Sequence, residues 1–220
     1  MLKTSDIFTL ENSLATDLLA STEYPWEALS KISDYILKLG ATLSLDDFEQ
    51  VEENIWIHRT AKVAPTACLN GPLIIDAESE VRHCAFIRGN ALIGKKCVVG
   101  NSTEIKNSIL IYHCEVPHYN YIGDSILGPY AHLGAGVITS NIKSDRKNIV
   151  VKTKEQHFET GLRKFGAMIG DRVEVGCNSV LNPGSVIGKN SRIYPLSMVR
   201  GFVPADSVYK CQNDICDLEN

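Results

Sequence analysis

Aliphatic residues recur at every sixth position through most of the chain. From residue 57 to residue 111 the series contains only Ile, Leu and Val, namely Ile57, Val63, Leu69, Ile75, Val81, Ile87, Ile93, Val99, Ile105 and Ile111. The register breaks at Pro117 and resumes one residue early. After the break it continues as Val116, Ile122, Leu127 and Leu133, and later as Ile169, Val175, Leu181, Ile187, Ile193 and Val199.

This period is neither the 2 of a strand nor the 3.6 of an amphipathic helix. It suits a solenoid of short parallel strands, in which three hexads make one triangular coil. The aliphatic side chains then point into the prism, and successive coils lie about 4.8 Å apart. The pattern therefore predicts an all-β solenoid, specifically a left-handed parallel β-helix of hexapeptide repeats. A β-sandwich with accidental spacing is the alternative fold.

The N-terminal segment, residues 1–50, does not follow this period. After Pro25 one helical face is apolar and Gly40 closes the stretch, with the apolar face made of Leu29, Ile32, Ile36 and Leu37. An earlier short helix is expected around residues 11–20. We expect these helices to cap or flank the first coil, because an uncapped coil exposes a sheet edge.

A second irregular stretch, residues 140–166, is polar and aperiodic. A long loop inserted in a solenoid is usually functional. The chain therefore divides into a helical extension at 1–50, a solenoid at 51–205 that carries this loop, and a C-terminal tail at 206–220.

Composition narrows the function classes. The 220 residues carry a formal net charge of -4, with 44% hydrophobic and 22% charged residues. A mildly acidic chain without a basic block is a poor candidate for binding nucleic acid or an anionic membrane. No apolar run approaches the roughly 18 residues that span a bilayer, and the first residues lack a signal pattern. The 7 cysteines form no C-x-x-C pair, which argues against a zinc finger or disulfide framework and favours the cytoplasm.

Candidate anion-binding residues lie near the interruption of the repeat. Arg88 and Lys106 are eighteen residues apart, one full coil, so we expect them one above the other on one face. Two stacked cations repel each other unless an anion binds them, and both side chains suit a phosphate. A nearby carboxylate, such as Glu104 for Lys106, is the alternative partner.

His118 follows the register-breaking Pro117, so its ring is expected to project out of the repeat. Imidazole is the usual general base for deprotonating an attacking amine, although a structural role is the commoner fate of a lone histidine. Tyr121 could orient a substrate or support the ring. Asn141 offers an amide for a substrate group or a developing oxyanion.

A zinc site is the metal alternative, of the kind seen in γ-class carbonic anhydrases. His113 and His118 are five residues apart, which suits part of a three-histidine set. His83 lies thirty residues before His113, which is not a whole number of coils. It is therefore expected on a different face, which disfavours the metal site.

Together these residues resemble the acetyltransferase domain of the bifunctional glucosamine-1-phosphate N-acetyltransferase/UDP-N-acetylglucosamine pyrophosphorylases. The resemblance is closer still to archaeal sugar-1-phosphate nucleotidyltransferase/acetyltransferases. It covers about residues 57–205 and is carried by the stretches 99–106, 118–124, 134–141 and 160–166. Its most specific feature is an ordered set at the family's spacing, namely Arg88, Lys106, His118, Tyr121, Asn141 and Lys147.

The resemblance implies an acetyl-CoA-dependent N-acetyltransferase that acts on an amino-sugar 1-phosphate. His118 would be the general base, and Tyr121 and Asn141 would position the sugar and acetyl groups. Arg88 and Lys106 would bind the sugar phosphate. Lys147 would add positive charge from the loop.

The resemblance also implies a homotrimer, with each site built from more than one chain and no tightly bound cofactor. A backbone N–H within residues 134–136 would hold the oxyanion. Acetyl-CoA would lie along the prism as co-substrate, beside Ala135, Gly136, Gly176, Cys177 and Pro195.

Two departures from the family pattern leave the acceptor sugar open. His132 stands where the bacterial enzymes have Asn, and the loop after Lys147 is longer than theirs. The nucleotidyltransferase domain is not expected, because 50 residues cannot house it. The alternative function is a non-catalytic trimeric scaffold that binds a sugar phosphate or partners a separate nucleotidyltransferase.

Overall fold

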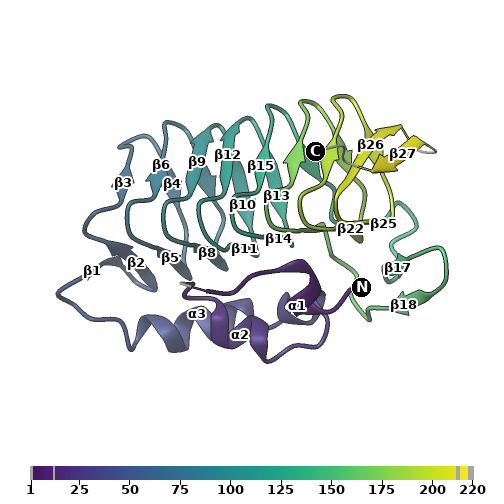
Figure 1. Ribbon diagram of the computed structural model, residues 1–220. Coiled ribbons are helices and arrows are strands. Elements are labelled where there is room, and N and C mark those ends of the chain that lie inside the picture. Colours follow the sequence, from purple (N-terminus) through teal and green to yellow (C-terminus); the bar gives the residue numbers. More distant parts are fainter. Residues whose placement is uncertain (1, 12, 212–213, 218–220) are drawn as a thin grey trace.

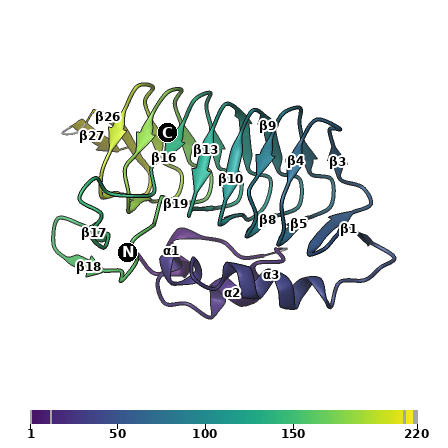
Figure 2. The same cartoon turned by 180° about the vertical axis from the view of Figure 1, so that it is seen from behind.

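The computed structural model describes residues 2–11, 13–211 and 214–217. The main body is a solenoid whose chain visits three sheets in turn, which we call sheets A, B and C (Figures 1 and 2). Among the described residues, sheets A and B each have nine strands and sheet C has seven. The predicted β-solenoid of hexapeptide repeats is confirmed.

The strands are short, as a period of six requires. Sheet A comprises β1 (Phe48–Glu52), β2 (Ile55–His58), β5 (Leu73–Ile75), β8 (Ala91–Ile93), β11 (Ser108–Leu110), β14 (Ile126–Leu127), β19 (Ala167–Ile169), β22 (Ser185–Ile187) and β25 (Phe202–Val203). Sheet B comprises β3 (Lys62–Val63), β6 (Glu80–Val81), β9 (Val98–Asn101), β12 (Glu115–His118), β15 (His132–Leu133), β20 (Glu174–Val175), β23 (Arg192–Ile193), β26 (Ser207–Cys211) and β27 (Asp214–Asp217). Sheet C comprises β4 (Cys68–Leu69), β7 (Phe86–Ile87), β10 (Glu104–Lys106), β13 (Tyr121–Gly123), β16 (Ile138–Thr139), β21 (Val180–Leu181) and β24 (Met198–Val199).

The hexad aliphatic residues stack inside the prism in the predicted register up to Ile105. The register then changes earlier than predicted: Leu110 pairs with Ile93 and takes the inward place, and Ile111 packs with the N-terminal helices instead. Ile87 pairs with Ile105 eighteen residues later, whereas Ile105 pairs with Ile122 after only seventeen. The early resumption of the repeat is therefore a coil shortened by one residue. Ile87, Ile105 and Ile122 are fully buried, and burial of each such side chain contributes about 1.5–3 kcal/mol.

The N-terminal helices lie along sheet A, below the prism in Figure 1, rather than over the end of the first coil. Sheet A presents a continuous apolar row outward, and the helices bury it. That row is Trp56, Ile74, Leu92, Ile109, Ile126, Met168 and Val186. Of the two expected placements, cap or flank, the helices take the second, along several coils of sheet A, while β1, antiparallel to β2, covers the first edge of that sheet.

The helices are shorter than the sequence predicted. They are α1 (Thr4–Ile7), α2 (Thr16–Ala20), the 3-10 helix η1 (Pro25–Ala28) and α3 (Ile32–Gly40). The single helix expected after Pro25 is broken between η1 and α3. At this break the carbonyl of Leu29 accepts a hydrogen bond of 3.2 Å from Asn107 Nδ2. In a continuous helix this carbonyl would accept a hydrogen bond from the helix itself, so here a side chain of the solenoid replaces that donor.

The inserted loop contains a hairpin of β17 (Val150–Lys152) and β18 (His157–Glu159). Phe158 and Phe165 from this insertion pack on Trp26, with ring centroids 6.0 and 5.9 Å away. The insertion is thereby joined to the N-terminal segment. In the C-terminal tail, β26 and β27 pair as a hairpin, and residues 212–213 and 218–220 lie outside the described residues. No helix in the described ranges is long and apolar enough to cross a membrane.

Candidate active site

The predicted site residues divide between the two long edges of sheet C. Where sheet C turns toward sheet A, the strands end beside Lys106, Asn107, Asp124 and Asn141, which we call the Asp124 edge. Where sheet B turns into sheet C lie His118 and its equivalents in neighbouring coils, which we call the His118 edge. The strand β13 connects the two edges, so one short strand separates them.

Asp124 is the centre of a buried side-chain network. Its side chain is 6% exposed, and the carboxylate accepts hydrogen bonds from Asn107 Nδ2 at 2.9 Å and Asn141 Nδ2 at 2.5 Å. Lys106 Nζ forms an ion pair with it at 3.2 Å. Asn141 Nδ2 also donates to the Tyr121 hydroxyl at 3.2 Å. The fold therefore brings together three of the six residues singled out in the sequence, Lys106, Tyr121 and Asn141, around an aspartate that sequence reasoning did not select.

Arg88 and Lys106 occupy equivalent positions in successive coils, because Ile87 pairs with Ile105. Their expected mutual repulsion is relieved within the chain. Arg88 Nη1 lies 2.7 Å from Glu104 Oε1, and this hydrogen bond raises the pKa of the guanidinium. The alternative, in which a nearby carboxylate pairs with each cation, is therefore what the structure has, but Glu104 pairs with Arg88 and Lys106 pairs with Asp124.

Tyr121 is half-buried and lies over the backbone of its own strand. A side-chain carbon added at Gly123 would come within 2.5 Å of the Tyr121 hydroxyl, so the glycine makes room for the phenol. Burial raises the pKa of Tyr121, and the negative charges of Asp124 and Glu104 raise it further. The phenol is therefore held as a neutral hydrogen-bonding group.

The His118 edge is a ladder of backbone hydrogen bonds. Gly136 N–H donates to the His118 carbonyl at 3.0 Å, and Asn178 N–H donates to the Ala135 carbonyl at 2.8 Å. Leu196 N–H continues the ladder to the Cys177 carbonyl at 3.0 Å. His118, Ala135 and Cys177 thus hold the same place in three successive coils.

The His118 side chain is exposed at this edge, as its position after Pro117 predicted. Within the described part of the chain, no side-chain or backbone group forms a hydrogen bond or an ion pair with its ring. Further along the edge, a side-chain carbon on Gly176 would overlap the backbone and ring of Pro195, and Cys177 is an exposed free cysteine. The His118 edge therefore has an exposed imidazole beside a surface made of small residues.

The backbone amides near the predicted oxyanion position are mostly engaged. Gly134 N–H donates to the Val175 carbonyl at 2.8 Å, and Gly136 N–H donates to the His118 carbonyl. Among the described residues, the Ala135 N–H has no such backbone partner. An oxyanion at this turn would therefore take the Ala135 amide.

Other candidates lie away from both networks. Lys147 is exposed on the insertion, where its backbone N–H donates to Asp145 at 3.0 Å. His132 Nδ1 lies 2.8 Å from Glu174 on sheet B, and His113 stacks on Tyr130 at 5.1 Å. The described ranges contain no group of three or more His, Cys, Asp or Glu side chains that could hold a metal ion.

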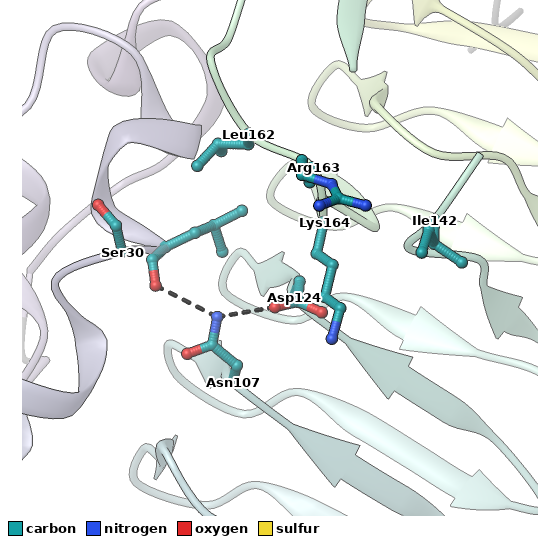
Figure 3. Close-up of a pocket in the computed structure, with 8 residues that line it drawn as sticks. Ser30, Asn107, Asp124, Ile142, Leu162, Arg163 and Lys164 are labelled. Carbon is teal, nitrogen blue, oxygen red and sulfur yellow. Dashed lines mark hydrogen bonds between the residues drawn. The ribbon is translucent and has the colours of Figure 1, made fainter. Parts of the chain in front are cut away.

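A cavity of about 470 Å³ opens beside the Asp124 edge, between the N-terminal segment and the insertion (Figure 3). Its lining residues are Leu29, Ser30, Asn107, Asp124, Ile142, Leu162, Arg163 and Lys164. Figure 3 shows the Lys164 side chain extending toward Asp124. Sequence reasoning did not place Arg163 or Lys164 at the site.

Two family models match the chain. The GMPPB C-terminal domain matches residues 69–156, and the bacterial transferase hexapeptide (six repeats) matches residues 166–201. The solved acetyltransferase domain of PglB from Neisseria gonorrhoeae FA1090, which is in complex with acetyl coenzyme A, is 13% identical with a TM-score of 0.35. That likeness covers 84% of this chain and 64% of that one.

Curated relatives are closer in sequence. The bifunctional protein GlmU of Methanococcus aeolicus is 38% identical over 82% of this chain and 48% of its own length. The bifunctional sugar-1-phosphate nucleotidylyltransferase/acetyltransferase of Sulfurisphaera tokodaii is 30% identical, over 80% and 49%. The uncharacterized acetyltransferase YaiX of Escherichia coli is 30% identical, over 70% and 73%. The chain thus spans about half the length of the bifunctional relatives.

Proposed function

Because the chain belongs to the family of hexapeptide-repeat β-helix acetyltransferases, we propose that it transfers the acetyl group of acetyl-CoA to the amine of an amino-sugar 1-phosphate. The observation that carries the proposal is the convergence of Lys106, Tyr121 and Asn141 around Asp124. A cation, a phenol and an amide in one place supply the donors that a phosphorylated sugar requires. The Sulfurisphaera relative, named for sugar 1-phosphates and acetyl transfer, supports the same class.

In the proposed mechanism, His118 accepts a proton from the sugar amine while the nitrogen attacks the thioester carbonyl. The new N–C bond forms, the C–S bond breaks, and the CoA sulfur leaves and takes up the proton. The developing oxyanion accepts a hydrogen bond from the Ala135 amide. The exposure of the His118 ring supports this role, because the base must reach a substrate outside the prism.

Acetyl-CoA would lie along the His118 edge, past Ala135, Gly136, Gly176, Cys177 and Pro195. The backbone ladder supports this placement, because it sets these turns in one row beside His118. The sugar would lie across sheet C with its hydroxyls toward Tyr121 and Asn141. Its phosphate would lie near the cations at the Asp124 edge, with Lys147 approaching from the insertion.

A homotrimer belongs to the same proposal. Sheet C and its border with sheet B carry exposed apolar side chains, with Ile138 40%, Met198 46% and Leu196 79% exposed. A second copy would cover these side chains and complete the site beside His118. Sedimentation velocity tests this: a single species of three chain masses supports the trimer, and a monomer contradicts it.

The central experiment follows thiol release from acetyl-CoA in the presence of glucosamine 1-phosphate, galactosamine 1-phosphate or free glucosamine. We expect turnover with an amino-sugar 1-phosphate and an N-acetylated product by mass spectrometry. His118→Ala should lower kcat by about 10²–10⁴-fold, the usual contribution of a general base. His157→Ala, an exposed histidine of β18, is the matched control and should leave kcat unchanged.

The outcomes separate the two functions. Absence of thiol release with every acceptor would overturn the acetyltransferase proposal. Thermal stabilisation by a sugar phosphate without any turnover would instead support the non-catalytic scaffold. Equal activity of wild type and His118→Ala would leave acetyl transfer in place and remove His118 as the base.

A further inference from the structure

Pro117 interrupts the backbone ladder directly before the proposed base. In the next two coils the same place holds Gly134 and Gly176, and each of their N–H groups donates at 2.8 Å to a carbonyl one coil further on. Proline has no N–H and cannot make this bond. The residue that carries the imidazole, His118, therefore follows a place where one bond between coils is missing.

A buried amide, Asn120, forms hydrogen bonds at this point instead. Asn120 is 2% exposed. Its Nδ2 donates to the Gly134 carbonyl of the next coil at 2.8 Å, and its Oδ1 accepts the His118 N–H at 3.1 Å. These partners fix the orientation of the amide, because a carbonyl requires a donor and an N–H requires an acceptor. One side chain thus joins the backbone of the imidazole residue to the following turn.

The bond to Gly134 also affects the proposed oxyanion donor. The Gly134 carbonyl and the Ala135 N–H belong to one planar peptide group and point in opposite directions. Because the buried Asn120 holds the carbonyl, the Ala135 N–H points away from the interior, toward the exposed edge. A hydrogen bond to the carbonyl also polarises the peptide and strengthens its N–H as a donor.

The same position in neighbouring coils shows what is particular to Asn120. Thr103 one coil earlier and Ser179 two coils later are also buried, and their hydroxyls donate to carbonyls of the next coil at 3.0 and 3.1 Å. Each hydroxyl also accepts an N–H from the next coil. A hydroxyl is therefore sufficient to join coils. What the amide adds is the bond to a residue of its own coil, His118.

We infer that Asn120 is a positioning residue that sets the His118 backbone and the Ala135 N–H relative to each other. Because Asn120 is buried, it acts through these two groups and not by contact with a substrate. The inference rests on the proposed acetyl transfer and deepens it, since base and oxyanion donor serve the same attack on the thioester. An error in their separation lowers the rate of that attack without weakening substrate binding.

The test compares kcat and KM of wild type, Asn120→Thr and Ser191→Ala by thiol release. Threonine keeps a donor toward the next coil, as Thr103 does, and loses the acceptor for the His118 N–H. We expect kcat of Asn120→Thr to fall about 5- to 10-fold, the equivalent of one neutral hydrogen bond, with the KM for both substrates unchanged.

Ser191→Ala is the matched control. Ser191 is fully buried at the turn from sheet A to sheet B, and its hydroxyl donates to the Pro204 carbonyl of the next coil at 2.7 Å. The substitution removes a bond between coils without changing either edge of sheet C. Its kcat should match that of wild type, and the two variants should have similar melting temperatures.

Amide hydrogen exchange, followed by NMR, gives a second readout that needs no turnover. The His118 N–H should exchange faster in Asn120→Thr than in wild type, because the substitution removes its acceptor. In Ser191→Ala this N–H should exchange at the wild-type rate.

The outcomes separate the inference from the proposed function. Equal kcat in wild type and Asn120→Thr, or an equal fall in Asn120→Thr and Ser191→Ala, would overturn the positioning role and leave acetyl transfer in place. A wild type without turnover would overturn the proposed function, and exchange of the His118 N–H then decides. Faster exchange in Asn120→Thr alone would support Asn120 as the group that fixes this backbone, and equal rates in all three proteins would overturn it.

Discussion

The two edges of sheet C are built by different means. At the Asp124 edge, side chains from β10, the turn that follows it and the insertion contact one buried carboxylate. At the His118 edge, backbone hydrogen bonds set the spacing and the imidazole stands exposed. The first edge is organised by the chain itself. The second presents an exposed imidazole that the described part of the chain leaves uncovered.

Replacement of Asp124 tests the first edge and has the largest expected effect on the fold. Asp124→Ala leaves Lys106 without its carboxylate and removes the acceptor shared by Asn107 and Asn141. Because the Lys106 side chain is 23% exposed, the expected cost in unfolding free energy is about 2–3 kcal/mol, below that of a fully buried pair. Urea denaturation measures it, and acetyl transfer should fall as well.

Asp145→Ala is the control, since it removes an aspartate that pairs with Lys143 at the surface of the insertion. Its unfolding midpoint should match that of wild type. If both variants unfold at the same urea concentration, the Asp124 network contributes nothing to the fold. The contrast between the two edges would then fail.

The part of this contrast that the sequence could predict follows from the period of six. Most inward positions can be predicted because Ile, Leu or Val fills them, although Thr139 is an exception. Two successive coils are one residue short, from Ile105 to Ile122 and from Ile122 to Thr139, and the first shows in the sequence as a displaced hexad. Outward contacts obey no such constraint. Asp124 is eighteen residues after Lys106, but only the coil that ends at Gly123 brings its carboxylate between Lys106 and Asn141.

The sequence does indicate that the outer face of sheet A is covered. On that sheet the residue before each inward aliphatic is also apolar, as in Ile74, Leu92 and Ile109. On sheet B that place is mostly polar, as in Glu80 and Glu174, and on sheet C Glu104 interrupts a row that is otherwise largely apolar. A doubly apolar strand is typical of a sheet buried on both faces. The pattern identifies a covered face, but where the helices break depends on contacts such as that between Asn107 and Leu29.

Replacement of Gly136 tests the second edge and has an intermediate expected effect. Gly136 has φ +72 and Gly161 has φ +70, so alanine strains both backbones by about 1–2 kcal/mol. Only at Gly136 would the new carbon overlap a neighbour, the Asn178 side chain, whereas nothing lies within 4 Å at Gly161. Gly136→Ala should therefore also raise the KM for acetyl-CoA, by steady-state kinetics.

Gly161→Ala is the matched control, because it carries the same backbone strain away from the His118 edge. The two variants should lose similar stability and differ in KM. An unchanged KM in Gly136→Ala would show that acetyl-CoA does not approach this turn.

The smallest expected effect concerns the phenol of Tyr121. Its pKa in the folded chain is raised by burial and by the charges of Asp124 and Glu104, so above about pH 10 the unfolded chain releases this proton first. The unfolded state then binds fewer protons than the folded state, and the free energy of unfolding falls as pH rises through this window. Tyr121→Phe removes this contribution. The free energy of unfolding of the variant should therefore decline less steeply between about pH 9 and pH 11.

At neutral pH the Tyr121→Phe variant loses the hydrogen bond from Asn141, which contributes about 1 kcal/mol. Tyr119→Phe, which removes a phenol that is 64% exposed, is the control. If both variants keep the wild-type slope, the pKa of Tyr121 is the same in the folded and unfolded chains. The negative charges at the Asp124 edge then do not raise the pKa of this phenol.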